Sequence, residues 1–262
     1  MNLQDAGHRD DHDYEIGSPH LTHPQLRNRI VGTIRAVLGG RLAATGQARV
    51  LEIGAGHGAF TDHVLATGAS VTVTEMSRAS ADVLRQRYAH NPAARVVFDE
   101  TGEALDARND EYDVVLCMSV LHHIPDYLAA IASWLPLLAA GGAFLSFQDP
   151  LYYPRRSRAN LAADRGAYYA WRVGHGDLVE GVKSFARRRR GAYDEANVRD
   201  MVEYHVLRDG VDEQAILDLL RPRFAEAELI TYWSTQSRAL QVVGQRLAAP
   251  TTFGVRAVGK RG

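Results

Sequence analysis

Short apolar runs alternate with helix-periodic segments along most of this 262-residue chain. The apolar runs, which we expect to be buried strands, cover residues 48–53, 70–74, 95–98, 112–118 and 143–147. Helices are expected between them, from about Phe60, from about Ser80 and from Asp126 to Leu138. This alternation predicts an α/β fold with a mostly parallel sheet that is covered by helices on both faces.

An amphipathic helix is expected ahead of the first strand. Thr22 and Gln25 form a capping-box pattern. Apolar residues then follow on one helical stripe, at Leu26, Ile30, Ile34, Val37 and Leu38. We expect the pair Gly39–Gly40 to end this helix. Residues 1 to about 20 are polar and lack periodicity, so the first dozen or so are expected to be frayed.

The alternation stops after residue 150. Residues 151–206 are rich in Arg, Tyr and Trp and are expected to form a helical cap inserted into the core. Regular patterning returns with a helix over Asp212 to Leu220, a strand near Leu229 to Trp233 and a last strand around Phe253 to Val258. We therefore divide the chain into a first core part with the N-terminal helices (1–150), the cap (151–206) and a C-terminal core part (207–262).

Composition and charge exclude several classes of partner. A formal net charge of -1 gives no overall field that would attract nucleic acid or an anionic membrane, so neither is expected as a partner. The single cysteine, Cys117, excludes an internal disulfide and a multi-cysteine metal site, and no metal is expected. The N-terminus lacks the apolar stretch of a secretion signal, which favours a cytoplasmic location.

One uncharged segment, Tyr127 to Phe147, is close to the roughly 20 residues that a membrane span needs. It contains Pro136 and the pair Gly141–Gly142. Because these residues interrupt a helix, we interpret the segment as a helix, a turn and a buried strand.

The most informative motif is the stretch from Val50 to Gly58, VLEIGAGHG, in which a buried strand leads into a glycine-rich turn. Glycines allow the backbone to approach a ligand closely, and the following helix N-terminus offers unpaired N–H groups. Glu75 ends the next strand, where a carboxylate can accept hydrogen bonds from both hydroxyls of a ribose. Together these residues predict an adenosine-containing cofactor at the carboxyl edge of the sheet.

Gly54, Gly56 and Ala59 also fit the loose dinucleotide-binding pattern, so a nicotinamide-dependent oxidoreductase is an alternative. Three features favour another family. Glu52 precedes the glycines, the stretch 112–126 (YDVVLCMSVLHHIPD) follows later, and Ala140-Gly141-Gly142 stands before a strand. In this order they resemble motifs of the class I S-adenosylmethionine-dependent methyltransferases, in the branch that acts on small molecules. The resemblance implies a Rossmann-like three-layer αβα sandwich with a seven-stranded sheet, mostly parallel with one antiparallel C-terminal strand.

The resemblance also implies which residues hold S-adenosylmethionine and its product S-adenosylhomocysteine. Glu52 and the turn of Gly54, Ala55, Gly56 and Gly58 would lie under the methionine part. Glu75 would bind the ribose, and Met76 would lie against the adenine. The family's usual Gly-Asp pair after the third strand is absent, and Glu100 and Thr101 are expected to meet the adenine edge instead. Met118 and Ser119 would line the pocket near the sulfonium.

Two consecutive histidines, His122 and His123, follow the fourth strand, near the place expected for a methyl acceptor. Methyl transfer needs a base only when the acceptor must lose a proton, and an imidazole is suited to that role. We expect one of the two to be the base and prefer His123. The alternative is that neither histidine has a catalytic role.

Acceptor-binding residues are expected at the same edge and in the cap. Gln148 and Asp149 end the fifth strand, although Asp149 could equally be a turn residue. Tyr14, His20 and His23 could fold over the cofactor. In the cap, Tyr152, Tyr153, Tyr168, Tyr169 and Trp171 could surround an aromatic acceptor, while Arg155 or Arg156 could bind a carboxylate. The alternative for each aromatic residue is the interior of a helical lid. The run Arg187–Arg190 is interpreted as a solvated cationic face rather than a nucleic-acid patch.

These observations predict an enzyme that transfers a methyl group to oxygen, nitrogen or carbon of a small acceptor, which we expect to be a secondary metabolite. A protein with the same fold and cofactor but non-methylating chemistry, such as cyclisation or decarboxylation, is an alternative. A non-enzymatic cofactor-binding protein is a further one. The oligomeric state is expected to be a monomer or a homodimer.

Overall fold

The structure is a computed structural model that describes residues 18–102, 104–105, 111–174, 209–246 and 249–262. Seven strands form one sheet in the order β3-β2-β1-β4-β5-β7-β6. Their bounds are Arg49–Ile53 (β1), Ser70–Glu75 (β2), Ala94–Phe98 (β3), Tyr112–Met118 (β4), Leu138–Pro150 (β5), Phe224–Tyr232 (β6) and Thr252–Lys260 (β7).

β7 is the one strand of this sheet that runs opposite to the others. It pairs in antiparallel fashion with both β5 and β6, whereas the pairs from β3 through β5 are all parallel. The mostly parallel sheet and its single antiparallel C-terminal strand were predicted, and the structure confirms both.

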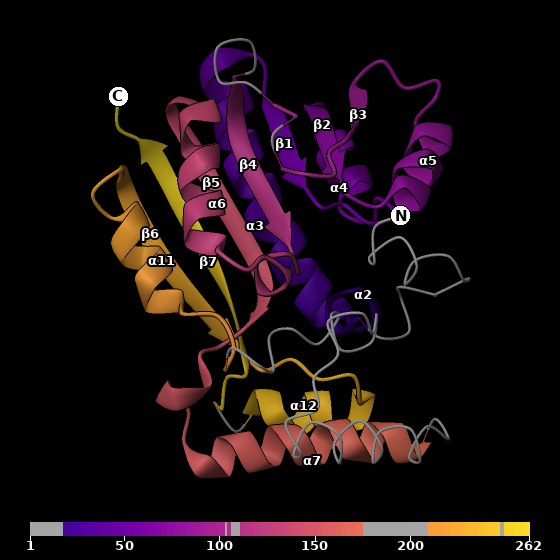
Figure 1. Cartoon of the computed structure of the whole chain (residues 1–262), viewed down its shortest axis with the longest axis vertical. Helices are drawn as coiled ribbons and strands as arrows, with labels where there is room; N and C mark the ends of the chain where they lie inside the picture. Colours follow the sequence, from indigo (N-terminus) through magenta and orange to yellow (C-terminus); the bar gives the residue numbers. More distant parts are fainter. Residues whose placement is uncertain (1–17, 103, 106–110, 175–208, 247–248) are drawn as a thin grey trace.

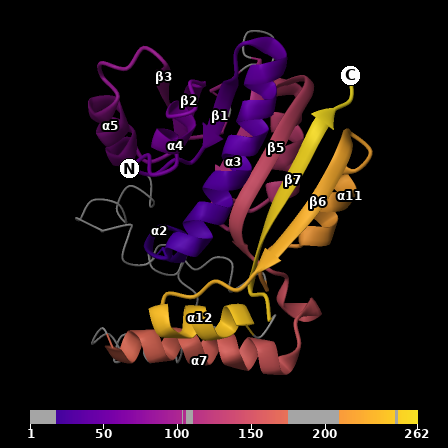
Figure 2. The ribbon, with the colours of Figure 1, turned by 180° about the vertical axis from the view of Figure 1, so that it is seen from behind.

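Two apolar layers cover the sheet (Figures 1 and 2). One face packs against α3 (Pro24–Thr45), α4 (Thr61–Leu65) and α5 (Arg78–Arg87), which bury Ile30, Val64 and Leu84 on it. The other face packs against α6 (Tyr127–Trp134) and α11 (Glu213–Leu220), which bury Ile131 and Leu217. The three-layer αβα sandwich is therefore confirmed. All carboxyl ends of the parallel strands meet at one edge.

The N-terminal helix differs from its prediction at both ends. Thr22 ends a separate short helix, α2 (Pro19–Thr22), and α3 begins after His23, which makes no side-chain capping bond. The capping-box prediction is wrong because the Thr22 hydroxyl donates back to Ser18 O within α2. Gly39 and Gly40 also fail to end α3, which continues to Thr45 before Gly46 at φ 74° closes it. Packing of the apolar stripe on the sheet outweighs the low helix propensity of the glycines.

The uncharged segment 127–147 is a helix, a turn and a strand, as predicted. α6 ends at Trp134, a 3₁₀ turn η2 (Leu135–Leu137) follows, and β5 begins at Leu138. None of the helices in the described ranges is long and apolar enough to cross a membrane.

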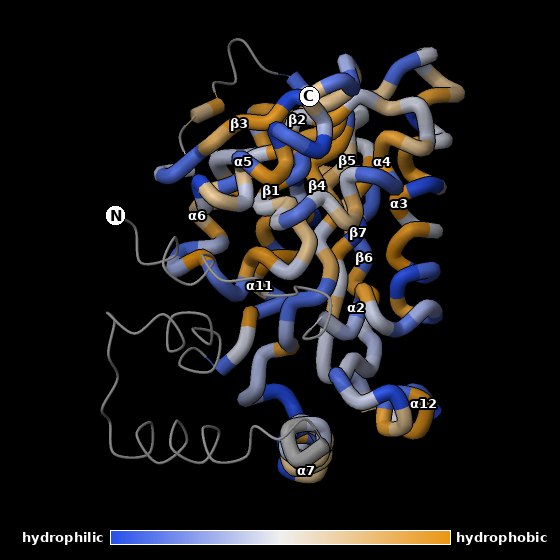
Figure 3. Tube along the Cα trace, turned by 90° about the vertical axis from the view of Figure 1, so that its right-hand side faces the viewer, coloured by the Kyte–Doolittle hydropathy of each residue, from blue (hydrophilic) through white to orange (hydrophobic). Residues whose placement is uncertain are grey.

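Three helices lie beyond the carboxyl ends of the parallel strands: α2, α7 (Arg158–Gly174) and α12 (Arg238–Arg246) (Figure 1). α7 falls in the segment predicted to be a cap, of which residues 175–208 lie outside the described residues. α12 was not predicted. The Trp233 ring packs against Gly244, where a β-carbon would come within 2.1 Å of the indole. Val242 and Val243 are exposed on α12, which carries apolar positions in Figure 3.

Candidate functional site

The glycine turn after β1 approaches the rest of the protein closely at two of its three glycines. All three have positive φ, at 64° for Gly54, 57° for Gly56 and 85° for Gly58. A β-carbon on Gly54 would lie 2.9 Å from Val120, and one on Gly58 would lie 2.6 Å from the Tyr88 hydroxyl. A β-carbon on Gly56 would meet nothing within 4 Å. The turn is therefore packed at both ends and open in the middle, as a backbone cradle for a ligand must be.

Glu75 is bonded directly to this cradle. Its Oε2 accepts a hydrogen bond from Gly56 N at 2.9 Å, and its Oε1 accepts one from Ser77 N at 3.0 Å. Two backbone donors thus hold the carboxylate at the end of β2, although only 6% of the residue is exposed. Each carboxylate oxygen has two acceptor sites, so the group can also accept bonds from ribose hydroxyls.

Glu52 lies beneath the turn with only 1% of its surface exposed. Its Oε2 accepts a hydrogen bond from the Thr61 hydroxyl at 2.7 Å. The pKa of Glu52 is raised to about 7, mainly by burial; the Thr61 hydrogen bond lowers it and the nearby Asp62 raises it by smaller amounts. A cationic group arriving at the turn would therefore stabilise the ionised form of this carboxyl group.

The residues expected near adenine lie at the ends of β2 and β3. Met76 is 38% exposed, and Glu100 and Thr101 are exposed as well. Asp99 shapes this loop, because its Oδ1 accepts hydrogen bonds from Gly102 N at 2.7 Å and from Ala104 N at 3.2 Å.

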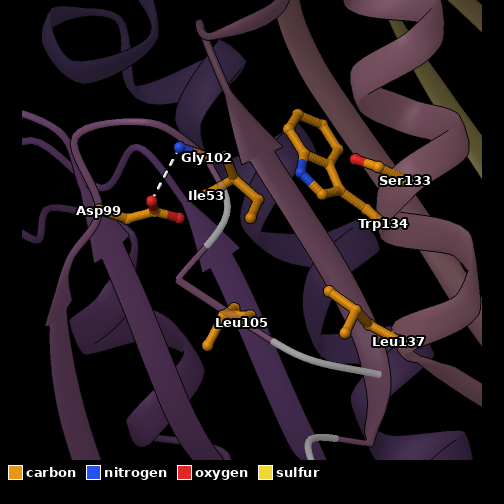
Figure 4. Close-up of a pocket in the computed structure, with 7 residues that line it drawn as sticks. All are labelled: Ile53, Asp99, Gly102, Leu105, Ser133, Trp134 and Leu137. Carbon is orange, nitrogen blue, oxygen red and sulfur yellow. Dashed lines mark hydrogen bonds between the residues drawn. The ribbon is translucent and has the colours of Figure 1, made fainter. Parts of the chain in front are cut away.

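A pocket of about 230 Å³ adjoins the same loop. In Figure 4, Asp99 and Gly102 lie on one side of it, Ser133, Trp134 and Leu137 lie on the other, and Ile53 lies between them. This pocket was not predicted, because its walls come from segments far apart in the chain: β1, the loop after β3, α6 and η2. It lies beside the position expected for adenine rather than over the glycine turn.

The loop after β4 contacts the glycine turn through Val120. Ser119, in this loop, has a positive φ of 59° and donates its backbone N–H to Phe147 O at 2.8 Å. Met118 is 7% exposed at the end of the strand. Both residues lie at the edge where the sulfonium is expected.

His122, in the 3₁₀ turn η1 (Leu121–His123), is bonded to Asp149 at the end of β5. Its Nδ1 lies 2.8 Å from Asp149 Oδ1, and its backbone N–H donates to the same oxygen at 3.1 Å. The Ser146 hydroxyl donates to Asp149 Oδ2 at 3.0 Å. Asp149 has no exposed surface, and its carboxylate contacts His122 instead of solvent. Both residues were predicted to lie at the site, but their contact was not predicted.

Burial disfavours charge on both members of this pair. It raises the pKa of Asp149, and the hydrogen bonds from His122 and Ser146 offset part of this increase. It lowers the pKa of His122, and the nearby His20 lowers it further. The ring of His123 lies 4.0 Å from that of His122, centroid to centroid.

His20 and His23 connect the N-terminal helices to this edge. The His20 ring stacks on Phe60, directly after the glycine turn, with centroids 5.7 Å apart. Its Nδ1 is buried and makes no hydrogen bond within the described structure. His23 Nε2 lies 2.7 Å from Thr235 O, in the segment before α12. His20 therefore lies beside the glycine turn, and His23 joins α3 to the segment before α12.

Two arginines that were expected to bind a carboxylate of the acceptor, Arg155 and Arg156, make ion pairs within the protein. Arg155 contacts Asp212 and Glu213, and Arg156 contacts Asp164 at 2.7 Å. Tyr152 lies under the Arg155 guanidinium and Tyr153 under that of Arg156.

The aromatic residues of α7 lie together. The Tyr168 ring is 5.8 Å from that of Tyr169 and 6.4 Å from that of Trp171. Tyr14 and the run 187–190 lie outside the described residues.

Gln148 precedes Asp149 near the end of β5. It has a positive φ of 69°, and it stands at a shift in the pairing of β5 with β7. Its Nε2 donates to Ser234 Oγ at 2.7 Å, and its Oε1 is buried without a hydrogen-bond partner in the described structure. A β-bulge has no reliable sequence signal when its residue is glutamine rather than glycine.

The arrangement is that of a nucleotide-binding α/β protein, with a glycine cradle and a carboxylate at neighbouring strand ends. A family model described as "Methyltransferase domain" matches residues 51–144, which include the turn, Glu75 and both histidines. Residues 51–144 are therefore similar to a methyltransferase domain, the kind of enzyme that the motifs predict.

Curated relatives match between about a third and about half of the chain. The ubiquinone biosynthesis O-methyltransferase of Vibrio cholerae serotype O1 (strain M66-2) is 35% identical over 95 residues, which are 36% of this chain and 39% of that protein. The enzyme of the same name from Ralstonia nicotianae is 33% identical over 143 residues, 53% of this chain and 56% of that one. The chain thus spans about half the length of these relatives, or less.

Solved structures share the fold over almost the whole chain. The plantazolicin methyltransferase BpumL in complex with S-adenosylhomocysteine has a TM-score of 0.56 at 13% identity, covering 99% of this chain and 94% of that one. The N-methyltransferase NodS from Bradyrhizobium japonicum WM9, with the same ligand, has a TM-score of 0.54 at 16% identity, covering 98% and 96%.

Proposed function

We propose that this protein transfers a methyl group from S-adenosylmethionine to a small-molecule acceptor at the carboxyl edge of the sheet. The observation that carries the proposal is the bond between Glu75 and Gly56 N, which joins a ribose-binding carboxylate to an open glycine cradle. When bound, the cofactor supplies a methyl group already activated by the positive charge on sulfur. The protein then has to align the acceptor and exclude water.

We assign each cofactor-binding residue to one part of the cofactor according to its position along the carboxyl edge of the sheet. Glu52 and the turn of Gly54, Ala55, Gly56 and Gly58 face the methionine part, and Glu75 faces the ribose. Met76, Glu100 and Thr101 surround the adenine, and Met118 and Ser119 border the methyl group. The residues fit the cofactor because the middle of the turn is open and because the buried Glu52 becomes a stronger partner for a cation once it ionises.

The acceptor is proposed to be a flat, partly apolar secondary metabolite. The aromatic group of Tyr168, Tyr169 and Trp171 on α7 and the pair Tyr152 and Tyr153 support this class, because aromatic side chains pack well on flat rings. Curated relatives named O-methyltransferases favour oxygen as the methylated atom. Arg156, whose Nη2 contacts Asp164, stays a proposed partner for a carboxylate group of the acceptor. A cytoplasmic location, a monomer or homodimer, and the absence of metal and nucleic-acid partners stay predictions.

The test is calorimetric titration of the protein with S-adenosylhomocysteine and, separately, with NADH. We expect micromolar binding of the first and none of the second. Glu75→Gln should weaken binding about 10- to 100-fold, because one ribose hydroxyl loses a charged acceptor. Arg85→Gln, on an exposed face of α5, serves as the control. Binding of NADH alone would replace this proposal with the oxidoreductase alternative.

The acceptor is then sought by following transfer of a labelled methyl group to phenols, anilines and β-ketoesters. Methylation of any of these separates the proposal from a protein that only binds the cofactor, and from one that uses the cofactor without losing its methyl group.

A further inference from the structure

We propose that Tyr88 is a positioning residue for the cofactor, because its hydroxyl group holds the glycine turn in the shape that binds S-adenosylmethionine. Arg87, the preceding residue, holds the same turn, and both side chains contact Asp62. We call Asp62, Arg87 and Tyr88 the turn clamp. This inference rests on the proposed function and goes beyond it, because the clamp lies outside the residues assigned to the cofactor.

The glycine turn is the part of the cradle that is least able to keep its own shape. Gly54, Gly56 and Gly58 all have positive φ. Glycine has access to more backbone conformations than any other residue, so a turn with three of them keeps one conformation only if its surroundings restrain it. A restrained turn binds a ligand more tightly, because less conformational freedom is lost when the ligand arrives.

Tyr88 occupies the space beside the last glycine of the turn. The residue follows α5 and is only 7% exposed. Its hydroxyl group lies 2.7 Å from Asp62 Oδ1 and 3.2 Å from Gly58 O, and its single hydrogen is shared between these two acceptors. Burial and the hydrogen bond to Asp62 raise the pKa of Tyr88, so the group remains a donor at neutral pH.

Asp62 connects Tyr88 to the backbone of the turn. It lies in the first turn of α4, and its backbone N–H donates to Gly58 O at 3.3 Å. Gly58 O therefore has two donors, one from the backbone of α4 and one from the Tyr88 side chain. Because a peptide group is planar, these contacts fix the orientation of the whole peptide between Gly58 and Ala59.

Arg87 holds the preceding carbonyl group of the turn. Its Nη1 donates to His57 O at 2.9 Å, and its Nη2 contacts the Asp62 carboxylate. The Arg87 side chain is 44% exposed, so its ion pair with Asp62 contributes little by itself. We therefore assign the larger part of the clamp to the buried Tyr88.

The same helix is also bonded to the other half of the cradle. Ser77 is the N-cap of α5, and its backbone N–H donates to Glu75 Oε1. The other oxygen of Glu75 accepts the N–H of Gly56. α5 thus contacts the ribose carboxylate at its first residues and the glycine turn at its last residues, so it holds the two halves in a fixed relation.

The first test is amide hydrogen exchange of the full chain without ligand, followed in the glycine turn. Tyr88→Phe removes only the hydroxyl group and should make the turn amides exchange about 5- to 10-fold faster, because the turn opens more often. Tyr112→Phe is the matched control, since it removes the hydroxyl group of a buried tyrosine at the start of β4, at the opposite edge of the sheet. Exchange in the turn that is equal in Tyr88→Phe and the parent protein overturns the proposal.

The second test is calorimetric titration of the same variants with S-adenosylhomocysteine. Tyr88→Phe should weaken binding about 10-fold, because the ligand then has to order the turn. Tyr112→Phe should bind like the parent protein. Thermal unfolding identifies a temperature at which every variant is folded, so that lower stability alone leaves the measured affinity unchanged. Unchanged affinity in Tyr88→Phe, or an equal loss in Tyr112→Phe, contradicts a positioning role.

Arg87→Gln provides a second variant that does not depend on how well Tyr88→Phe folds, because the Arg87 side chain is partly exposed. It should weaken S-adenosylhomocysteine binding about 3-fold, since one carbonyl group of the turn loses its donor. Arg85→Gln removes an exposed arginine of the same helix and is its control. Equal affinities of these two variants would show that Arg87 does not hold the turn and would remove the clamp.

Asp62 allows a rescue experiment. Asp62→Asn keeps an oxygen that can accept the hydrogen bond from Tyr88, whereas Asp62→Ala does not. The asparagine variant should therefore bind S-adenosylhomocysteine more tightly than the alanine variant. Adding Tyr88→Phe should weaken binding less in Asp62→Ala than in the parent protein, because the two residues act through one contact. Losses that simply add would show two independent effects and no clamp.

The failures of the two proposals are distinguishable. If the parent protein does not bind S-adenosylhomocysteine, the proposed function is wrong, and hydrogen exchange still tests whether Tyr88 holds the turn. If the parent protein binds this ligand and Tyr88→Phe binds it equally well, only the turn clamp is wrong.

Discussion

The two sides of the carboxyl edge hold their polar groups in different ways. On the β1–β2 side, backbone N–H groups of Gly56 and Ser77 hold the Glu75 carboxylate, and positive φ angles fall on glycines. On the β4–β5 side, side chains hold one another, as in the contact of His122 with Asp149, and positive φ angles fall on Ser119 and Gln148. The first side is built from backbone, and the second depends on the identity of particular side chains.

This difference teaches where binding and selectivity are encoded. A backbone cradle accepts one cofactor shape whatever the neighbouring side chains are, so it can serve many acceptors. Non-glycine residues in the left-handed region cost of order 1 kcal/mol each and persist only where the surroundings hold them. The β4–β5 side is therefore the side where substitution should change acceptor selectivity more than cofactor binding.

The largest predicted effect is on the pH dependence of stability, and it compares the buried carboxyl groups of Glu52 and Asp149. Glu52 accepts one described side-chain hydrogen bond, whereas Asp149 accepts three. Since burial raises the pKa of Glu52 from 4.5 to about 7, its neutral form favours folding below pH 4.5, and this contribution is lost as pH rises to about 7. The side chain of Glu52→Gln is uncharged at every pH, so this variant should not lose that stabilisation as the pH rises. The difference in unfolding free energy between the two proteins should change by about 2.5 kcal/mol between about pH 5 and about pH 8.

Urea unfolding at both pH values measures this change, and Asp149→Asn provides the contrast. That variant weakens a network of three bonds and should be less stable than the parent at each pH. If the difference in unfolding free energy between Glu52→Gln and the parent protein is the same at both pH values, Glu52 ionises as easily as an exposed glutamate.

The next effect should separate folding from binding within the glycine turn. Gly58→Ala should destabilise the protein by about 2–3 kcal/mol, because its β-carbon would lie 2.6 Å from the Tyr88 hydroxyl at a φ of 85°. Gly56→Ala meets no atom within 4 Å and should cost only about 1 kcal/mol of backbone strain. Its methyl group should instead enter the cradle and weaken S-adenosylhomocysteine binding.

Thermal unfolding and calorimetry on the two variants measure both quantities. If Gly56→Ala binds S-adenosylhomocysteine as tightly as the parent protein, the open middle of the turn is not the cofactor cradle.

The smallest effect should come from relieving strain on the β4–β5 side. Ser119 has a φ of 59°, which glycine adopts without a steric penalty. Ser119→Gly should stabilise the protein by about 0.5 kcal/mol, because the relief slightly exceeds the entropy that glycine loses on folding. Destabilisation in urea unfolding would instead show that the serine side chain makes a favourable contact.

Local patterns explain what could be predicted from the sequence. The strand at 48–53, its glycine turn and Glu75 are readable because each depends on residues adjacent in the chain. The end of α3 was mispredicted because packing carries the helix past Gly39 and Gly40. α12 was missed because its contact, the Trp233 ring on Gly244, is tertiary.

The site divides in the same way. Both histidines and Asp149 were named as candidates, but their pairing joins residues 27 apart. It depends on a one-residue bulge at Gln148, and no periodicity of apolar residues reports such a bulge.

The chain contains three tryptophans, and the structure distributes them among three regions. Trp134 borders the pocket beside the β3 loop, Trp171 lies on α7, and Trp233 lies against α12 (Figure 4 shows the first). Each indole is thus an intrinsic fluorophore for one part of the molecule. Variants that keep a single tryptophan would report by emission wavelength and quenching which part responds first when a ligand is mixed with the protein.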